Sequence, residues 1–377
     1  MFCVNKAPYF RKERVDMESR KEDNYFHQLG KLRRKPLAIA GPCSAETREQ
    51  VLDTARQLKD LQVDIFRAGV WKPRSKPGTF EGVGLEGMAW LQEVRHEFGL
   101  PVATEVAKPQ HIEFALKHNI DVLWIGARTT VNPFAVQELA EALRGTRVPV
   151  MVKNPVNPDL ALWAGAIERL WAVGVTDVAA IHRGFSSYEP SQYRNLPLWQ
   201  IPVQLKAQYP NLPIIVDPSH ISGKPELIYP LSQKALDLDF DGVMIETHPN
   251  PKAALSDADQ QITPAVLGEI LAKLQVRSMP DQAFVSRAEE LRKKIDRADR
   301  EILEALARRM RVVEQIGEDK KENNVAILQL ERWNEIFLTR PDWAIQLNLH
   351  PEFIQELYQL IHVESIRIQT EVVKKDN

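Results

Sequence analysis

The chain has 377 residues, 44% of them hydrophobic, so it is long enough for more than one domain and can bury at least one large core. A formal net charge of −2 excludes bulk attraction to nucleic acid or to anionic membranes. Two cysteines cannot form a disulfide framework, and we find no apolar run of about 18 residues and no signal-peptide core, which predicts a cytoplasmic protein.

Residues 1–32 alternate in charge with little periodicity, which predicts a short helical or partly ordered N-terminal extension. From 33 to 275, eight apolar, β-branched runs alternate with segments of helical spacing such as 47–61 and 133–143. The runs are 36–43, 63–68, 101–106, 121–125, 149–153, 175–181, 213–216 and 241–245. Because they are almost continuously apolar, they predict a parallel sheet buried on both faces, and the length fits a (β/α)8 barrel.

A polar residue with potential chemistry stands at or just after the end of each predicted strand. These residues are Cys43, Arg67, Glu105, Arg128, Lys153, Arg183, His220 and Glu246. Active sites of such barrels lie at the carboxyl ends of the strands, so we expect these side chains to converge on one mouth.

The segment 66–80, FRAGVWKPRSKPGTF, places Arg67, Lys72, Arg74 and Lys76 in a stretch that prolines and glycines hold out of a helix. Taken alone, it is typical of a solvated basic loop. Together with the other cations, it predicts an anion site.

Four further residues suggest a metal. Individually, Cys43 is typical of a small buried hydrophobe, His220 of a capping histidine, and Glu246 or Asp257 of a solvated carboxylate. Together they offer sulfur, nitrogen and oxygen ligands at one rim. Such a set suits a divalent Mn, Fe, Co or Zn ion better than Mg or Ca, without choosing among them.

Five cations are predicted at the same mouth: Arg67, Lys72, Arg128, Lys153 and Arg183. Single arginines are usually surface ion pairs, but five without matching local carboxylates would repel one another. We therefore expect a ligand with several negative charges.

The motifs AGPCS, FRAGVWKPRS, WIGARTT, VKNP, HRGF, DPSH and IETHP occur in this order. Over residues 36–275 they resemble 3-deoxy-D-arabino-heptulosonate-7-phosphate (DAHP) synthase of the compact I-beta type. That resemblance implies a metal-dependent condensation of phosphoenolpyruvate with erythrose 4-phosphate. It also implies metal ligation by Cys43, His220, Glu246 and Asp257.

The same resemblance implies further roles. Phosphoenolpyruvate would be held by Arg67, Lys72, Arg128, Lys153 and Arg183, and the erythrose 4-phosphate by Arg74 and Ser75. Lys72 is a candidate proton donor to the developing alkoxide, and Glu105 a candidate for handling the attacking water. The related 3-deoxy-octulosonate 8-phosphate synthase has an asparagine-containing segment where this chain reads KPRS, which favours the four-carbon acceptor here.

Residues 276–285 interrupt the pattern and predict a linker, after which 286–377 is helical throughout. Within it, Arg292, Asp299, Arg309 and Lys320 share one helix face with apolar residues at steps of three and four. A dimerisation coiled coil is one interpretation. Because three cations face a single acid, a small dianionic ligand is the other.

This region resembles the all-helical chorismate mutases, with LRKKID opening the first of three helices and His350-Pro351 preceding the last. The resemblance implies that Arg292, Arg309 and Lys320 hold the substrate carboxylates and ether oxygen, with Arg332, Ser365 and Gln369 completing the site. Where the family often has two acidic residues, this chain has Gln329 and Trp333, which leaves the contacts to the substrate hydroxyl open.

We therefore predict a bifunctional enzyme acting on phosphoenolpyruvate, erythrose 4-phosphate and chorismate, with no nucleic-acid or membrane partner. The alternative keeps the barrel as the sole enzyme and makes the helical region a regulatory or dimerisation module. A first helix of about 50 Å is longer than two remaining helices can cover, so we expect a homodimer through this region, with Arg292 crossing the interface. The extension before Pro36 is short for a ligand-binding domain, so we expect any feedback by chorismate or prephenate to act through the mutase pocket.

Overall fold

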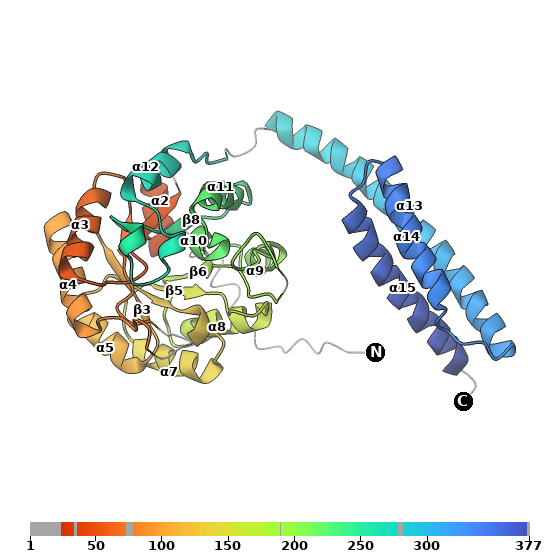
Figure 1. The fold of residues 1–377 in the computed structure, drawn as a ribbon, viewed down its shortest axis with the longest axis horizontal. Coiled ribbons are helices and arrows are strands. Elements are labelled where there is room, and N and C mark those ends of the chain that lie inside the picture. Colours follow the sequence, from red (N-terminus) through yellow and green to blue (C-terminus); the bar gives the residue numbers. More distant parts are fainter. Residues whose placement is uncertain (1–23, 34–35, 73–77, 189, 278–281, 375–377) are drawn as a thin grey trace. The chain divides into compact units, whose positions relative to one another are not determined.

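The computed structural model describes residues 24–33, 36–72, 78–188, 190–277 and 282–374. The chain divides into two compact units, residues 1–278 and 279–377, which are described separately (Figure 1). Within the described ranges, no helix is both long enough and apolar enough to cross a membrane.

The first unit is a closed barrel of parallel strands in the order β1 to β8. The strands are β1 (Leu37–Gly41), β2 (Ile65–Arg67), β3 (Val102–Val106), β4 (Val122–Ile125), β5 (Val150–Lys153), β6 (Val178–His182), β7 (Ile214–Val216) and β8 (Gly242–Glu246). Closure is made by β8 against β1, in register from Leu37 opposite Gly242 to Gly41 opposite Glu246. The predicted barrel is therefore confirmed.

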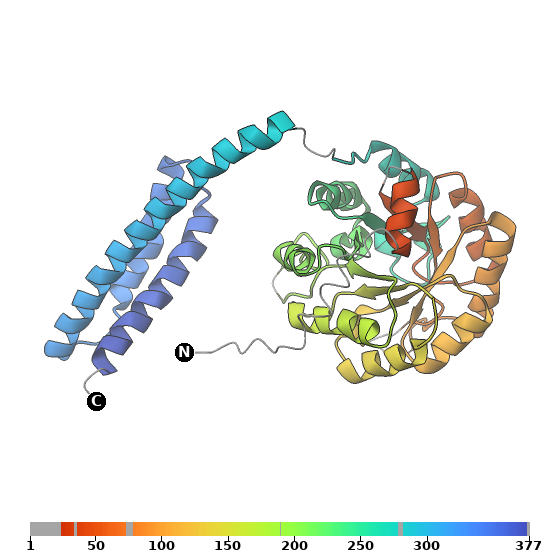
Figure 2. The same cartoon turned by 180° about the vertical axis from the view of Figure 1, so that it is seen from behind.

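Helices surround the barrel in the alternating order that the sequence predicts (Figures 1 and 2). They are α3 (Arg48–Leu58), α4 (Leu85–Phe98), α5 (Pro109–Lys117), α6 (Ala127–Thr130), α7 (Pro133–Leu143), α8 (Leu160–Ala172), α9 (Gln200–Gln208), α10 (Pro218–Ser222), α11 (Ile228–Asp237) and α12 (Pro264–Lys273). Short 3-10 turns lie at Pro225–Leu227, Pro251–Ala253 and Ala258–Gln260. Several helices begin at an N-cap residue whose side-chain oxygen accepts a backbone N–H of the first turn. At Thr47, for example, the side chain accepts the Gln50 N–H.

Every strand is buried on both faces, which explains the continuous apolar runs. One set of side chains, including Ile39, Trp124 and Met151, fills the barrel interior. The alternate set, including Phe66 and Val152, packs against the surrounding helices. At roughly 25 cal/mol for each Å² of apolar surface removed from water, these two layers are the main source of the barrel's stability.

Helix α2 (Tyr25–Arg33) belongs to the expected N-terminal extension and closes the amino-terminal end of the barrel. Phe26 is 2% exposed and packs with Leu37 and Val122 in the interior cluster. The backbone N–H of Tyr25 donates to Asp177 Oδ1 at 2.9 Å, just before β6. Residues 1–23 of the extension lie outside the described ranges.

Three aspartates just before strands β2, β4 and β8 hold the neighbouring strands in register. Asp64 accepts the Ala38 N–H, Asp121 the Val102 N–H, and Asp241 the Ile214 N–H, at 2.8 to 2.9 Å. Each carboxylate satisfies a backbone donor at the end of the barrel opposite the predicted active site.

The second unit contains α13 (Gln282–Glu322), α14 (Leu330–Gln346) and α15 (Pro351–Lys374). Helix α15 packs against both α13 and α14, and it begins at Pro351 as predicted. Helix α13 begins four residues before the expected residue 286, since nothing in Gln282–Val285 opposes a helix. Leu291, Ile295 and Ile302 on α13 are each more than half exposed.

Candidate active sites

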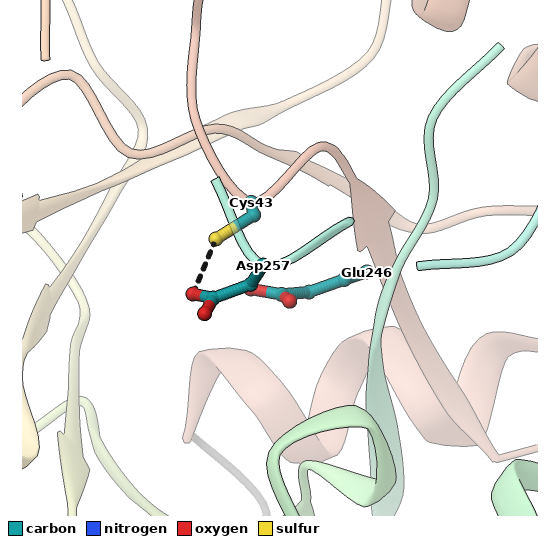
Figure 3. A group of neighbouring side chains, drawn as sticks. All are labelled: Cys43, Glu246 and Asp257. Atoms are coloured by element: carbon teal, nitrogen blue, oxygen red, sulfur yellow. Dashed lines mark hydrogen bonds between the residues drawn. The ribbon is translucent and has the colours of Figure 1, made fainter. Parts of the chain in front are cut away.

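The carboxyl ends of β1 and β8 bring three predicted metal ligands together (Figure 3). Cys43 follows β1, Glu246 ends β8, and Asp257 lies in the loop after β8. Their ligand atoms all lie within 4.8 Å of one another, and Cys43 Sγ is 3.2 Å from Asp257 Oδ2. Cys43 and Glu246 are fully buried.

The fourth predicted ligand, His220, adjoins this group. Its Nε2 is 3.8 Å from Glu246 Oε1, while its Nδ1 is 2.8 Å from Asp217 Oδ2. Asp217 also caps α10 by accepting the His220 N–H. Asp217 contacts Nδ1 of the imidazole, so Nε2 is directed at Glu246 and the other predicted ligands. Metal-ligating histidines are usually oriented in this way, by a carboxylate on the ring nitrogen that does not bind the metal.

The donor chemistry of the four side chains fits a divalent transition metal, because it combines a thiol, an imidazole and two carboxylates in one buried place. Burial, and then Glu246, raise the pKa of the Cys43 thiol to about 12. Burial would raise the pKa of Asp257, but Lys72 and Arg194 hold it below its usual range.

Arg67, the last residue of β2, is the most deeply buried of the predicted anion-binding cations, with 1% exposure. Its Nη2 is 3.2 Å from Glu246 Oε1, and its guanidinium lies 4.9 Å from the centre of the Trp124 ring. Among the described residues, its Nε and Nη1 atoms have no hydrogen-bond partner. Buried guanidinium donors of this kind suit an anionic ligand.

The expectation that the cations lack matching carboxylates was wrong in part. Lys153 Nζ is 2.9 Å from Asp217 Oδ2, and Arg67 is paired with Glu246 as described above. Lys72 Nζ lies 2.8 Å from Cys43 Sγ. Asp217, in the DPSH motif, was not counted among the carboxylates near the mouth, because its pairing with Lys153 joins residues 64 positions apart. The case for an anion site therefore rests on the unpaired atoms of Arg67 rather than on excess charge.

Arg183 is buried after β6 and donates to Asn195 Oδ1 at 2.8 Å and to the Gly184 carbonyl. The pKa of Arg183 is lowered to about 10, chiefly by burial, with Asp217 opposing the fall and Arg194 and Arg128 adding to it. Arg128 is exposed on the short helix α6, three residues after the end of β4.

Glu105 on β3 is 9% exposed and accepts the Trp124 Nε1–H at 2.9 Å. A Cβ on Gly126 would lie 2.1 Å from Glu105 Oε1, so a side chain at that position would displace the carboxylate. Arg74 and Ser75, assigned to the second substrate, lie outside the described residues.

Sequence reasoning missed Arg194 and Gln260, which link the carboxylates of the two predicted metal ligands Asp257 and Glu246 by hydrogen bonds. Arg194 Nη1 donates to Asp257 Oδ1 at 3.0 Å and to Gln260 Oε1 at 2.5 Å. Gln260 Nε2 donates in turn to Glu246 Oε2 at 2.5 Å. Arg194 lies in a loop without a strand or motif to single it out.

In the second unit, α13 and α15 bring Arg309, Lys320, Ser365 and Gln369 to one region. Arg309 Nη1 donates to Ser365 Oγ at 2.6 Å, and Lys320 Nζ to the Ile327 carbonyl at 2.6 Å. Gln369 is 8% exposed, and its Oε1 has no partner within the described ranges. Burial is the main cause that lowers the pKa of both Arg309 and Lys320.

The other two predicted residues, Arg332 and Arg292, are both exposed. Arg332 is exposed and forms an ion pair with Glu335 at 2.5 Å. Arg292 is exposed on the amino-terminal half of α13. Sequence reasoning also missed Arg340, whose guanidinium lies 4.3 Å from the Trp343 ring and whose buried Nε has no partner in the described part of the chain.

Comparison with known families divides the chain near residue 279, where the structure also divides into its two units. Residues 29–279 match the DAHP synthetase I family, and residues 291–370 match chorismate mutase type II. The chain belongs to the DAHP synthetase I family. It joins a DAHP synthase domain to a chorismate mutase domain, so the predicted bifunctional organisation is confirmed at the level of the families.

Individual relatives agree with this assignment. A phospho-2-dehydro-3-deoxyheptonate aldolase from Thermotoga maritima is 32% identical over 241 residues, which cover 63% of this chain and 68% of the relative. A 2-dehydro-3-deoxyphosphooctonate aldolase from Thiobacillus denitrificans is 27% identical, over 63% of this chain and 88% of the relative. The crystal structure of a Thermotoga maritima DAHP synthase matches with a TM-score of 0.57 at 31% identity, covering 63% of this chain and 67% of that one.

Proposed function

We propose that the barrel condenses phosphoenolpyruvate with erythrose 4-phosphate, releasing phosphate, and that the helical domain rearranges chorismate to prephenate. The observation that carries the first reaction is the buried guanidinium of Arg67, with two unpaired atoms, beside the cluster of Cys43, Glu246 and Asp257. The test is phosphoenolpyruvate consumption that depends on the aldose phosphate. No consumption with any metal in the predicted set would contradict the proposal.

A divalent Mn, Fe, Co or Zn ion would be held by Cys43, His220, Glu246 and Asp257, where it would supply a Lewis acid for the aldehyde carbonyl. Asp217 orients His220 toward this position. Arg67 and Lys72 balance the charge of the two carboxylates.

The remaining polar residues of the mouth would position the substrates. Arg67, Lys153 and Arg183 would bind the carboxylate and phosphate of phosphoenolpyruvate, with Arg128 approaching from α6. Burial disfavours the charged form of Lys72, but the nearby anionic groups, Glu246 among them, raise its pKa above the usual value, so Lys72 is a protonated group that can donate to the developing alkoxide. Glu105 would orient or deprotonate the attacking water.

Carbon count distinguishes this reaction from that of the phosphooctonate relatives. A seven-carbon product formed from three-carbon phosphoenolpyruvate needs a four-carbon acceptor, whereas an eight-carbon product needs a five-carbon one. The motif KPRS at 72–75 favours the four-carbon acceptor. Turnover of a five-carbon aldose phosphate faster than erythrose 4-phosphate would reverse this assignment.

The mutase reaction needs no nucleophile and no metal. It requires a compact substrate conformer and stabilisation of negative charge on the breaking ether. Arg309 and Lys320 supply cations from α13, and Gln369 and Ser365 supply polar atoms from α15. Loss of chorismate absorbance on adding the protein tests it. If chorismate binds without turnover, the helical domain is a regulatory module, as Gln329 and Trp333 would allow.

We also propose that a second copy of the chain covers the exposed apolar side chains of α13. Leu291, Ile295 and Ile302 are 56 to 57% exposed in one chain, and Arg292 lies among them. A dimer would bury this stripe and bring Arg292 to the partner's pocket. Sedimentation should therefore give a dimer, and a monomer with full mutase activity would contradict it.

Finally, we propose that prephenate or chorismate bound to the helical domain inhibits the synthase. A ligand can couple two sites only by its difference in affinity for two arrangements, typically about 1–3 kcal/mol. Synthase activity of the full chain should fall with prephenate, and Arg309→Ala should abolish that response. Equal inhibition of both proteins would place the inhibitor at the barrel.

A further inference from the structure

His362 lies on α15 one turn before Ser365 of the proposed mutase site, although no prediction from sequence included it. It shares a face of α15 with Ser365 and Gln369, which follow it by three and seven residues. Arg309 and Lys320 on α13 are the two charges that act on its ring. Ser365 accepts the Arg309 Nη1–H at 2.6 Å, so His362 lies one turn of α15 from a residue that contacts Arg309.

The ring of His362 is oriented by an aromatic contact. Trp333 on α14 meets it edge to face, with ring centres 4.1 Å apart and planes at 73°. Trp333 is itself packed against Phe337, whose ring centre is 4.4 Å away. The imidazole is thus held by a rigid neighbour that offers it no strong hydrogen-bond acceptor.

The Nε2 atom of His362 is buried and has no hydrogen-bond partner among the described residues. The same is true of Gln369 Oε1, two turns further along α15. A buried polar atom without a partner costs free energy, so each of these two atoms needs an explanation, and a ligand that bonds them provides one. Both atoms belong to the helix face that meets the two cations.

The charge state of His362 limits what this ligand group can be. Burial, and then Arg309 and Lys320, lower the pKa of the ring, so the imidazole is neutral in the physiological range. The two cations already match the two carboxylates of a dianion. A neutral imidazole adds a hydrogen bond without adding charge, which suits an uncharged polar group of the same ligand.

We propose that His362 Nε2 binds the ring hydroxyl of chorismate and so acts as a further substrate-binding residue of the mutase site. This inference rests on the proposed mutase function. Trp333 would serve this contact by holding the imidazole edge to face.

The test compares the full chain with His362→Leu and His362→Gln. Leucine removes the polar atom, whereas the glutamine amide can reach the place of Nε2. With chorismate we expect His362→Leu to lower kcat/KM about tenfold, as for the loss of one buried hydrogen bond, and His362→Gln to restore most of it. With an analogue that has hydrogen in place of the hydroxyl, the wild-type protein and His362→Leu should be alike.

Two controls separate binding from folding. Glu364→Gln changes an exposed residue two positions away that pairs with Arg367, and it should leave both substrates unaffected. The helical circular-dichroism signal and the thermal midpoint of the helical domain in each variant report whether that domain is folded. An unchanged kcat/KM in His362→Leu, or an equal loss with chorismate and with the analogue, overturns the inference. Absence of turnover in the wild-type chain instead contradicts the mutase function itself.

Discussion

Arg194 Nη1 lies 3.0 Å from Asp257 Oδ1, so an arginine in a surface loop holds a candidate metal ligand from behind. The same nitrogen reaches Gln260, whose amide bonds Glu246. One side chain therefore fixes two of the carboxylates in the cluster. Partners of this kind set the direction in which ligand oxygens point.

We predict that Arg194→Ala weakens metal binding by about 10- to 100-fold, the range found when such supporting partners are removed. The dissociation constant can be measured by competition with a chromogenic chelator, apart from any activity. Arg48→Ala is the matched control, because Arg48 forms an exposed ion pair with Glu93 elsewhere on the barrel. Equal metal affinity in Arg194→Ala and in the control would remove Arg194 from the site.

Cys43→Ser should abolish most of the metal affinity, since serine replaces a soft sulfur ligand with a hydroxyl that binds these metals poorly. Chelation of the wild-type protein should stop the condensation in the same way. Mutase activity should be unchanged in both cases, because the cations of that site need no metal. Full condensation in chelated, metal-free protein would falsify the four-residue metal site.

The two reactions should be separable by single substitutions. Lys72→Ala should remove phosphoenolpyruvate consumption and leave chorismate turnover, while Arg309→Ala should do the reverse, since each residue lies in a different unit. Each loss is expected to exceed 100-fold, the scale for removing a positioned charged group from a transition state. An unchanged mutase rate in Arg309→Ala would favour the regulatory-module interpretation.

The barrel could be predicted from the sequence because its strands are buried on both faces and its helices are amphipathic. Both features leave a pattern in the local sequence that can be recognised without knowing which residues are neighbours in space. Asp257 was predicted only through the resemblance of its motif, whereas Cys43 and Glu246 were expected to lie close together because residues at the carboxyl ends of barrel strands converge by geometry, and the structure brings all three together. The predictions for Cys43 and Glu246 depend only on where each residue stands relative to the end of its strand, and that position can be read from the sequence.

The partners of these residues could not be predicted in the same way. Arg194 and Asp257 are 63 residues apart, and only the folded loops bring them together. Asp217 pairs with Lys153 across 64 residues, which changed the charge balance inferred for the mouth. His362 was missed because its place on the face of Ser365 gains meaning only once α13 and α14 are packed against it.

The amino-terminal end of the barrel offers a contrasting test, because its residues should affect stability and not chemistry. Phe26 is 2% exposed in the barrel interior, at the end opposite the candidate active site. Phe26→Ala removes most of a buried aromatic ring from a place where neighbouring strands cannot collapse, and should cost about 3–5 kcal/mol of barrel stability. The measurement is the urea concentration at the midpoint of barrel unfolding, monitored by far-ultraviolet circular dichroism.

Phe134→Ala is the control for that measurement. Phe134 is 83% exposed on α7, so its removal should change the free energy of unfolding by no more than about 0.5 kcal/mol. Below the unfolding transition, Phe26→Ala should keep the wild-type KM for both synthase substrates, since the strands' carboxyl ends are unaltered. A raised KM with unchanged stability would mean that α2 acts on the active site and is not simply the closure of the barrel.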